Sequence, residues 1–220
     1  MNTFRFQILE MRPSTARDWL VFWAKWYEDE TGYDPEYNDL ITKHQSFSAE
    51  EFRRIGKWKD NAISPGKWKP NVASVAYLIW EQVAVELPHC PSDDEVEGFL
   101  NDWANRTYKD TFRDKPPRTK VFGVPRATTI LHFVSGGRYP IFDSRVRTAI
   151  ARLLGRRKLP DTVGSYLHSY VPLFNELADC CGTKDDLRML DKALFSFGAI
   201  KQEHFLKLSH WLRQPSPGTT

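Results

Sequence analysis

Asp143 is a candidate catalytic residue, and it lies directly before a stretch that the sequence predicts to be helical. Apolar residues then recur at helical spacing, at Val146, Ala149, Ile150, Leu153 and Leu154. An aspartate in this place caps the helix by accepting hydrogen bonds from its first amides. An ionised carboxylate can also stabilise a developing positive charge or orient a water molecule. The two roles are compatible, because a capping carboxylate can also face a cleft.

A tight glycine turn, Phe122-Gly123-Val124-Pro125, precedes a short helix upstream of this aspartate. Proline suits the first helical position, where its missing N–H would have no partner. Glycine lets the backbone come close to another molecule, and the amides that open the helix form a site for a phosphate. Arg126, Arg145 and Arg147 could then contact neighbouring phosphates of a nucleic acid without reading its sequence.

The positive charge of the chain is concentrated around these residues. Residues 101–158 hold 14 Lys and Arg against 4 Asp and Glu, in a chain whose net charge is only +3. Such asymmetry indicates a polyanion that binds one region of the surface. The alternative is a solvated helical face without a partner.

Composition bounds the class of protein. At 220 residues, 41% of them apolar, the chain can bury one substantial core or two small lobes. No run approaches the roughly 18–20 apolar residues that span a bilayer, and the N-terminal residues lack the features of a signal peptide. Cys90, Cys180 and Cys181 suit neither a disulfide framework nor a four-cysteine metal site. We therefore expect a cytoplasmic protein without membrane contact, metal or cofactor.

The common catalytic signatures are missing from the chain. It has no GK[ST] phosphate loop, no Rossmann glycine fingerprint, no HExxH and no GxSxG elbow. The six histidines show no metal-ligand spacing, so structural or surface roles are expected for all of them. They are His44, His89, His132, His168, His204 and His210.

Helical periodicity and capping residues predict an all-α protein of about ten helices. The expected helices cover residues 14–30, 37–43, 48–59, 71–86, 92–111, 125–134, 143–154, 162–181, 183–197 and 202–212. Pro172 requires a kink or a restart within its helix. The alternation of Phe4, Phe6 and Ile8 is typical of a short edge strand. The turn-rich stretch 61–70 is a candidate domain boundary, and residues 213–220 are expected to form a flexible tail.

Taken together, the glycine turn and the aspartate resemble the helix-hairpin-helix DNA glycosylase superfamily. The matching segments read GVPRATTILHF from Gly123 and YPIFDSRVRTAIARLLG from Tyr139. They show the glycine hairpin, the Thr-Ala-type helix and the aspartate that opens a D-x-x-V-x-R helix. The stretches FSAEEFRRIGKWKD and LRMLDKALFSFG are also similar to small bacterial relatives of that superfamily.

This resemblance implies two helical lobes with a cleft between them, and an activity on DNA. Residues 66–134 would form the central lobe, and residues 1–65 with 135–212 the other, which carries the catalytic Asp143. A base flipped out of double-stranded DNA would enter the cleft. The implied DNA contacts are Gly123, Val124, Arg126, Ala127, Thr128, Arg145 and Arg147. Trp58, Lys59 and Phe122 are candidates for the base pocket.

Three departures from the family pattern refine the expected activity. The second glycine of the usual hairpin is Pro125 here, which removes one amide from the phosphate cradle. The lysine of members that also cleave the strand is replaced by Ala127, which predicts a monofunctional enzyme. The cysteine loop that holds an iron–sulfur cluster in some members is absent.

The sequence does not identify the excised base, and it leaves alternatives to an enzymatic function. Alkylated purines, a mismatched pyrimidine, oxidised guanine and a hypermodified base of phage DNA are all candidates, the last implying antiphage defence. A non-catalytic helix-hairpin-helix module that only binds DNA is one alternative. A protein-interaction domain with an incidental basic region is another. A monomer is expected.

Overall fold

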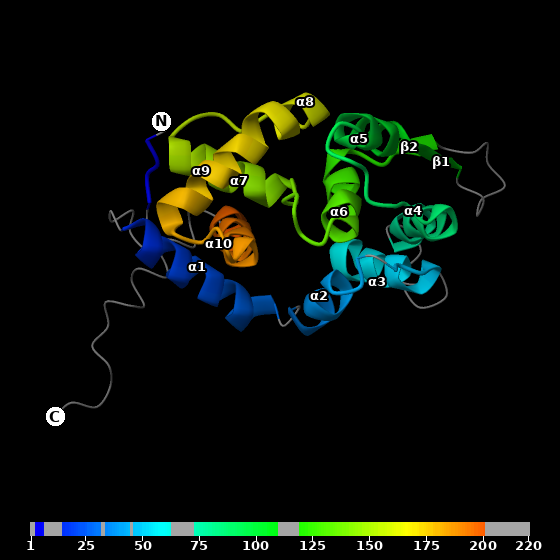
Figure 1. Cartoon of the computed structure of the whole chain (residues 1–220), viewed down its shortest axis with the longest axis horizontal. Helices are drawn as coiled ribbons and strands as arrows, with labels where there is room; N and C mark the ends of the chain where they lie inside the picture. The colour runs from blue at the N-terminus through cyan, green and yellow to red at the C-terminus, as the bar shows by residue number, and fades with distance from the viewer. Residues whose placement is uncertain are drawn as a thin grey trace. The chain divides into compact units, whose positions relative to one another are not determined.

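The computed structural model describes residues 3–6, 15–31, 34–44, 46–62, 73–109 and 119–200. Helices dominate these residues, which confirms the all-α prediction (Figure 1). They are α1 (Ala16–Thr31), α2 (Asp34–Ile41), α3 (Ala49–Asp60), α4 (Ala73–Glu86), α5 (Val96–Asn105), α6 (Val124–Val134), α7 (Ser144–Leu154), α8 (Val163–Ser165), α9 (Val171–Cys181) and α10 (Leu187–Ala199). Within this described part, no helix is long and apolar enough to cross a membrane.

Capping residues set many of the helix ends as expected. The Thr15 hydroxyl accepts a hydrogen bond from the Asp18 amide at the start of α1. Ser48 and Glu51 form a capping box at the start of α3. Gly155 ends α7 in the left-handed conformation, at φ 61°, which glycine adopts without strain. These local signals therefore predict the corresponding boundaries correctly.

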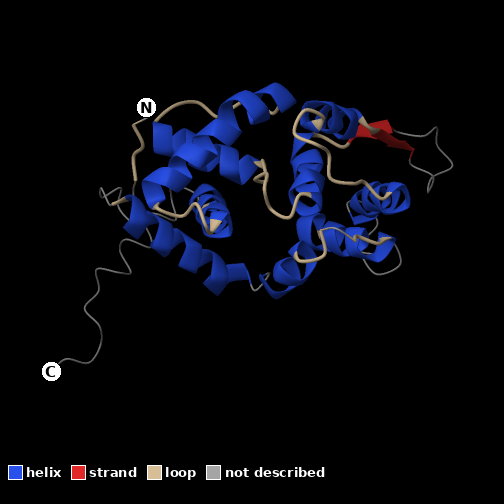
Figure 2. Cartoon of the chain, in the orientation of Figure 1, coloured by secondary structure: helices blue, strands red, loops and turns tan. Residues whose placement is uncertain are grey.

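The region after α5 differs from the prediction of one helix over 92–111. The helix ends at Asn105, and a short antiparallel ribbon follows, with Thr107–Lys109 (β1) paired to Thr119–Val121 (β2) (Figure 2). The Phe122 amide donates to the Arg106 carbonyl at 2.9 Å and so extends the pairing. Pairing with a distant segment has overridden the helical periodicity here. Residues 3–6 form no strand, and the rest of the strand expected near the N-terminus lies outside the described residues.

Pro172 produces the expected irregularity in the helix over 162–181. A π-helical turn, Tyr166–Tyr170 (η2), separates α8 from α9, and the Val171 amide donates to the Tyr166 carbonyl five residues earlier. Proline has no N–H to continue the α-helical pattern, so the chain uses a wider turn just before it. The last expected helix, 202–212, and the tail, 213–220, lie outside the described residues.

The chain divides into two compact units. Unit 1 comprises Met1–Glu30, Asp143–Pro160 and Leu173–Thr220, and in it α7 packs against α10. Trp19 and Trp23 of α1 contact the Phe197 ring of α10, with ring centroids 5.5 and 5.3 Å apart. The Arg152 guanidinium donates to the carbonyls of Phe197 and Ile200, where the last turn of a helix lacks internal donors.

Unit 2 comprises Thr31–Phe142 and Asp161–Pro172. Its helix α6 is buried from Ala127 to Val134 without interruption, as expected for a helix enclosed on all sides. Helices α3 and α4 pack closely, because Gly56 leaves room for the Trp80 side chain. The Arg53 guanidinium pairs with Glu81 at 2.6 Å across the same two helices.

These boundaries differ from the lobes implied by the resemblance. Residues 31–62 belong to unit 2, together with 135–142, rather than to the lobe that holds Asp143. The turn-rich connector that suggested a boundary instead joins α3 to α4 within one unit. The Gly56–Trp80 contact and the Arg53–Glu81 pair give the physical reason.

Because α10 packs closely on α7, adding one methyl group at Gly198 should strongly lower the stability of the fold. A Cβ atom at Gly198 would overlap the backbone carbonyl of Arg145, and backbone cannot swing aside as a side chain can. We expect Gly198→Ala to lower the free energy of unfolding by about 3 kcal/mol, measured by urea denaturation. Gly98→Ala is the control, because a Cβ there meets no atom within 4 Å. It should leave stability unchanged or raise it by about 0.5–1 kcal/mol. Equal effects of the two changes would contradict the described packing.

Candidate functional site

Asp143 is the N-cap of α7. Its Oδ1 accepts hydrogen bonds from the amides of Arg145 and Val146, at 2.9 and 3.0 Å, and its backbone is extended. The side chain is half-buried. The capping role read from the sequence is therefore confirmed.

The two arginines that follow Asp143 differ in their surroundings. Arg145 is exposed, and its guanidinium lies over the Phe195 ring at 4.3 Å from the centroid. Arg147 is half-buried and donates through Nε to the Leu159 carbonyl at 2.8 Å. Arg147 thus holds the end of its own unit together, whereas Arg145 keeps its charge at the surface. Arg156, Arg157 and Lys158, just beyond α7, are also exposed.

The glycine turn is tied to the preceding elements of unit 2. Gly123 has φ 81° and ψ 160°, a conformation that side-chain-bearing residues rarely adopt. Its amide donates to the Ala104 carbonyl at 3.0 Å, and its carbonyl accepts from the Ala127 amide at 3.2 Å. Val124 opens α6 with its side chain buried, and Pro125 follows in the first turn. The predicted helix after a glycine turn is therefore present.

Arg126, an expected phosphate contact, has partners inside unit 2. Its Nε donates to Asp60 at 2.7 Å, and one Nη donates to the Phe122 carbonyl at 3.2 Å. Asp60 also accepts from the Trp80 indole at 2.8 Å. One carboxylate thus links α3, α4 and the start of α6. No local pattern in the sequence indicates this link, because Asp60, Trp80 and Arg126 are far apart in the chain.

Ala127 and Thr128 lie inside the protein rather than at a surface. Both residues have 0% exposure, so neither side chain can reach DNA. The prediction that Ala127 and Thr128 contact DNA through their side chains is therefore wrong. The Thr128 hydroxyl donates to the Pro125 carbonyl at 3.2 Å and accepts from the Phe142 amide at 3.1 Å. Thr128 therefore anchors the residue that directly precedes Asp143.

Two further side chains of unit 2 fix the same segment, Tyr139–Phe142. His132 Nδ1 lies 2.7 Å from the Tyr139 carbonyl, and the Tyr166 hydroxyl donates to the Pro140 carbonyl at 3.0 Å. The Phe142 ring packs against Tyr166 and Tyr170, with centroids 5.6 and 4.8 Å away. Hydrogen bonds to its backbone and packing of the Phe142 ring thus hold the segment before Asp143 in place.

The bonds of His132 define its tautomer. A carbonyl only accepts hydrogen bonds, so Nδ1 must carry the proton that it shares with Tyr139. Nε2 lies 2.9 Å from the Tyr37 hydroxyl, which can donate to it. The neutral ring satisfies both partners, and the structural role expected for this histidine is confirmed.

Of the three residues expected to line a base pocket, Phe122 lies in the core of unit 2. Phe122 is 1% exposed and packs against Trp103, with ring centroids 5.8 Å apart. Trp58 contacts Tyr37 and Phe133. Lys59 is half-buried. Phe122 is therefore a core residue, and Trp58 belongs to a separate aromatic cluster.

The glycine turn belongs to unit 2 and Asp143 to unit 1, and the chain passes from one to the other between Phe142 and Asp143. Among the described residues, no three His, Cys, Asp or Glu side chains are grouped so that they could hold a metal ion. Comparison with known proteins finds no family model, no curated protein and no solved structure that matches this chain.

Thr128 and Thr129 provide a matched test of the anchor. Both hydroxyls donate to the Pro125 carbonyl and both side chains are fully buried, but only Thr128 also accepts the Phe142 amide. Thr128→Val removes the hydroxyl that accepts this bond, so we expect a loss of about 1–3 kcal/mol in the free energy of unfolding. Thr129→Val should cost less. Chemical denaturation of both variants measures the difference, and a larger loss at Thr129 would contradict the anchoring role.

Proposed function

We propose that this chain is a monofunctional DNA glycosylase that excises a damaged or modified base from double-stranded DNA. One observation carries the proposal: Asp143 caps α7 directly after a segment whose backbone is hydrogen-bonded to side chains of α6, the helix that follows the glycine turn. The residues that form this combination are those on which the resemblance to the helix-hairpin-helix superfamily depends. The enzyme acts as a monomer, without a cofactor, in contact with the nucleoid.

Asp143 stabilises the transition state in this mechanism. The C1′–N bond of a flipped nucleotide breaks, and positive charge develops on the sugar while the electron pair leaves with the base. The ionised carboxylate opposes that charge. It also orients a water molecule, whose oxygen adds to C1′ and whose proton passes through Asp143 to the departing base. The products are a free base and an intact strand with an abasic site.

DNA is held without sequence readout. The turn at Gly123 brings backbone close to a phosphate, and Arg145 adds an exposed charge beside the capped helix. Pro125 contributes no amide, so this grip is weaker than that of a turn with two glycines. Arg126 adds the part of its guanidinium that its bonds to Asp60 and the Phe122 carbonyl leave exposed. Binding should fall steeply with salt, because it depends on phosphate contacts.

The Asp143→Asn variant tests the catalytic role. Asparagine caps a helix as well as aspartate does, so the fold should be retained, but it carries no negative charge. We expect base release to fall by at least about 100-fold while DNA binding is kept. The assay incubates the protein with a panel of damaged and phage-derived DNAs and identifies the released bases by mass spectrometry.

Asp186→Asn is the matched control for this variant. Asp186 caps α10 in the same unit and accepts from the Met189 amide at 3.0 Å, so the chemical change is the same. It should leave base release unchanged. Full activity of a well-folded Asp143→Asn protein would disprove catalysis by Asp143. Salt-dependent DNA binding by the unaltered protein without any base release would favour the non-catalytic DNA-binding module.

Strand cleavage should not accompany base release. The lyase route needs an amine that attacks the sugar and forms a Schiff base. The position that carries this lysine in bifunctional relatives is Ala127, a fully buried methyl group. We therefore expect borohydride to trap no covalent adduct and the strand to break only after alkali or heat. A borohydride-dependent adduct on the purified protein would contradict this expectation, and Lys120 would be the first residue to replace.

A further inference from the structure

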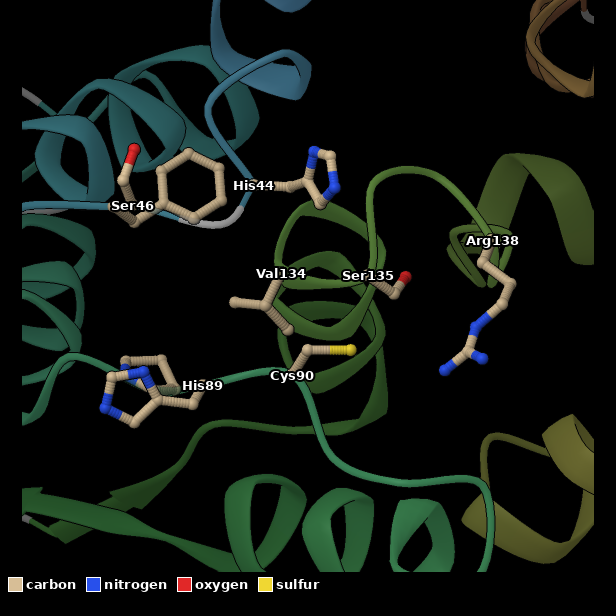
Figure 3. Close-up of a pocket in the computed structure, with 9 residues that line it drawn as sticks. His44, Ser46, His89, Cys90, Val134, Ser135 and Arg138 are labelled. Atoms are coloured by element: carbon tan, nitrogen blue, oxygen red, sulfur yellow. The ribbon is translucent and has the colours of Figure 1, made fainter.

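A separate pocket of about 560 Å³ lies within unit 2 (Figure 3). Three segments supply its walls: the loop after α2, the loop after α4 and the C-terminal end of α6. His44 extends from the first loop, and His89 and Cys90 from the second, with the end of α6 drawn between them. The volume is typical of a site for a small molecule.

The lining of this pocket favours an anion. It presents the Arg138 guanidinium and the imidazoles of His44 and His89, and no described residue that lines it carries a carboxylate. Asp93, outside the lining, pairs with one Nη of Arg138 at 3.0 Å, which leaves the remaining guanidinium donors for a ligand. Planar, multiply donating guanidinium groups suit phosphate oxygens.

The two imidazoles of the pocket differ in their hydrogen bonds. His89 makes no hydrogen bond with any described residue. His44 shares Nδ1 with the Ile41 carbonyl at 3.2 Å, which leaves Nε2 for a ligand. The His44 ring also lies against Gly136, where a Cβ would come within 3.0 Å of it. This contact holds the imidazole in place and explains the glycine at that position.

The remaining lining residues are apolar. Phe47, Pro88 and Val134 form a surface suited to a flat ring rather than to a solvated ion alone. Donors on one part of the lining and an aromatic surface on another together match a ligand with a phosphate and a planar group.

We infer that this pocket binds a phosphate ester of mononucleotide size, whose phosphate is attracted by the guanidinium and imidazole groups of the lining and whose ring lies against Phe47. A free nucleotide and the 5′-phosphorylated end of a DNA strand share this chemistry. The inference depends only on contacts within unit 2 and stands apart from catalysis by Asp143.

Cys90 provides a direct readout of occupancy. Its thiol is free, exposed and part of the lining, so a bound ligand should shield it from alkylation. Cys180 is equally free and exposed but belongs to unit 1, and serves as an internal control. Burial raises the pKa of the Cys181 thiol to about 12, so that thiol should stay unmodified in the folded protein.

The experiment alkylates the full-length protein with iodoacetamide and follows each cysteine by peptide mass spectrometry. A deoxynucleoside monophosphate should slow modification of Cys90 by about tenfold or more at saturation and leave Cys180 unaffected. The matching uncharged nucleoside should protect far less. Oligonucleotides with a 5′-phosphate and a 5′-hydroxyl distinguish a strand end from a free nucleotide as the source. Protection by either phosphate ester supports the inference.

Variants then test the recognition. Arg138→Gln should raise the nucleotide concentration for half-protection by about tenfold, because a charge-assisted pair is lost. Arg157→Gln removes an exposed guanidinium from unit 1, outside the pocket, and should change nothing. His89→Gln breaks no internal bond, so it keeps the fold while weakening protection. No protection of Cys90, equal protection by nucleoside and nucleotide, or protection that survives both pocket variants would overturn the inference.

Discussion

The segment Tyr139–Phe142, buried from Pro140 onward, imposes the constraint on which much of unit 2 depends. Its backbone belongs to no helix or strand, so its polar groups must find partners among side chains or lose the hydrogen bonds that water would give them. Thr128, His132 and Tyr166 supply those partners, with distances of 3.1, 2.7 and 3.0 Å. The first two lie one turn apart on α6, whereas Tyr166 comes from the π-helical turn before Pro172. The need to pair a few backbone atoms thus explains a buried threonine, a neutral histidine and the placement of a segment far along the chain.

The sequence predicts local structure well wherever the signal is itself local. Asp143 and Ser48 are read correctly as caps, because the groups that they bond lie two or three residues away. The end of α5 could not be predicted in the same way. Helical periodicity continues beyond Asn105, but pairing of Thr107–Lys109 with a segment beyond residue 118 decides the outcome. The boundary between units escaped prediction for a related reason, since the packing of Trp80 on Gly56 joins helices that a turn-rich stretch separates.

Charged and polar residues of the candidate site show the same limit. The sequence shows directly that Arg126 and Thr128 lie close to the glycine turn along the chain, and that Arg147 lies close to Asp143. What the sequence does not reveal is the partner: Asp60 for Arg126, the Leu159 carbonyl for Arg147 and the Phe142 amide for Thr128. A guanidinium that is already bonded gives up part of its capacity for phosphate. Arg145 stacks on the Phe195 ring, and this contact leaves its donors directed to solvent or to a ligand.

Capping alone does not require an aspartate at position 143. Thr15 and Thr162 cap other helices of this chain through a hydroxyl, so an uncharged oxygen would satisfy the amides of α7 equally well. Nor is aspartate in itself a sign of catalysis, because Asp186 caps α10 with the same chemistry. What separates the two aspartates is their surroundings in the chain. Asp143 follows a segment whose backbone is fixed by three side chains, and an exposed arginine stands two residues after it. Capping requires neither feature, so it is the surroundings of Asp143 in the chain, and not the cap itself, that distinguish it from Asp186.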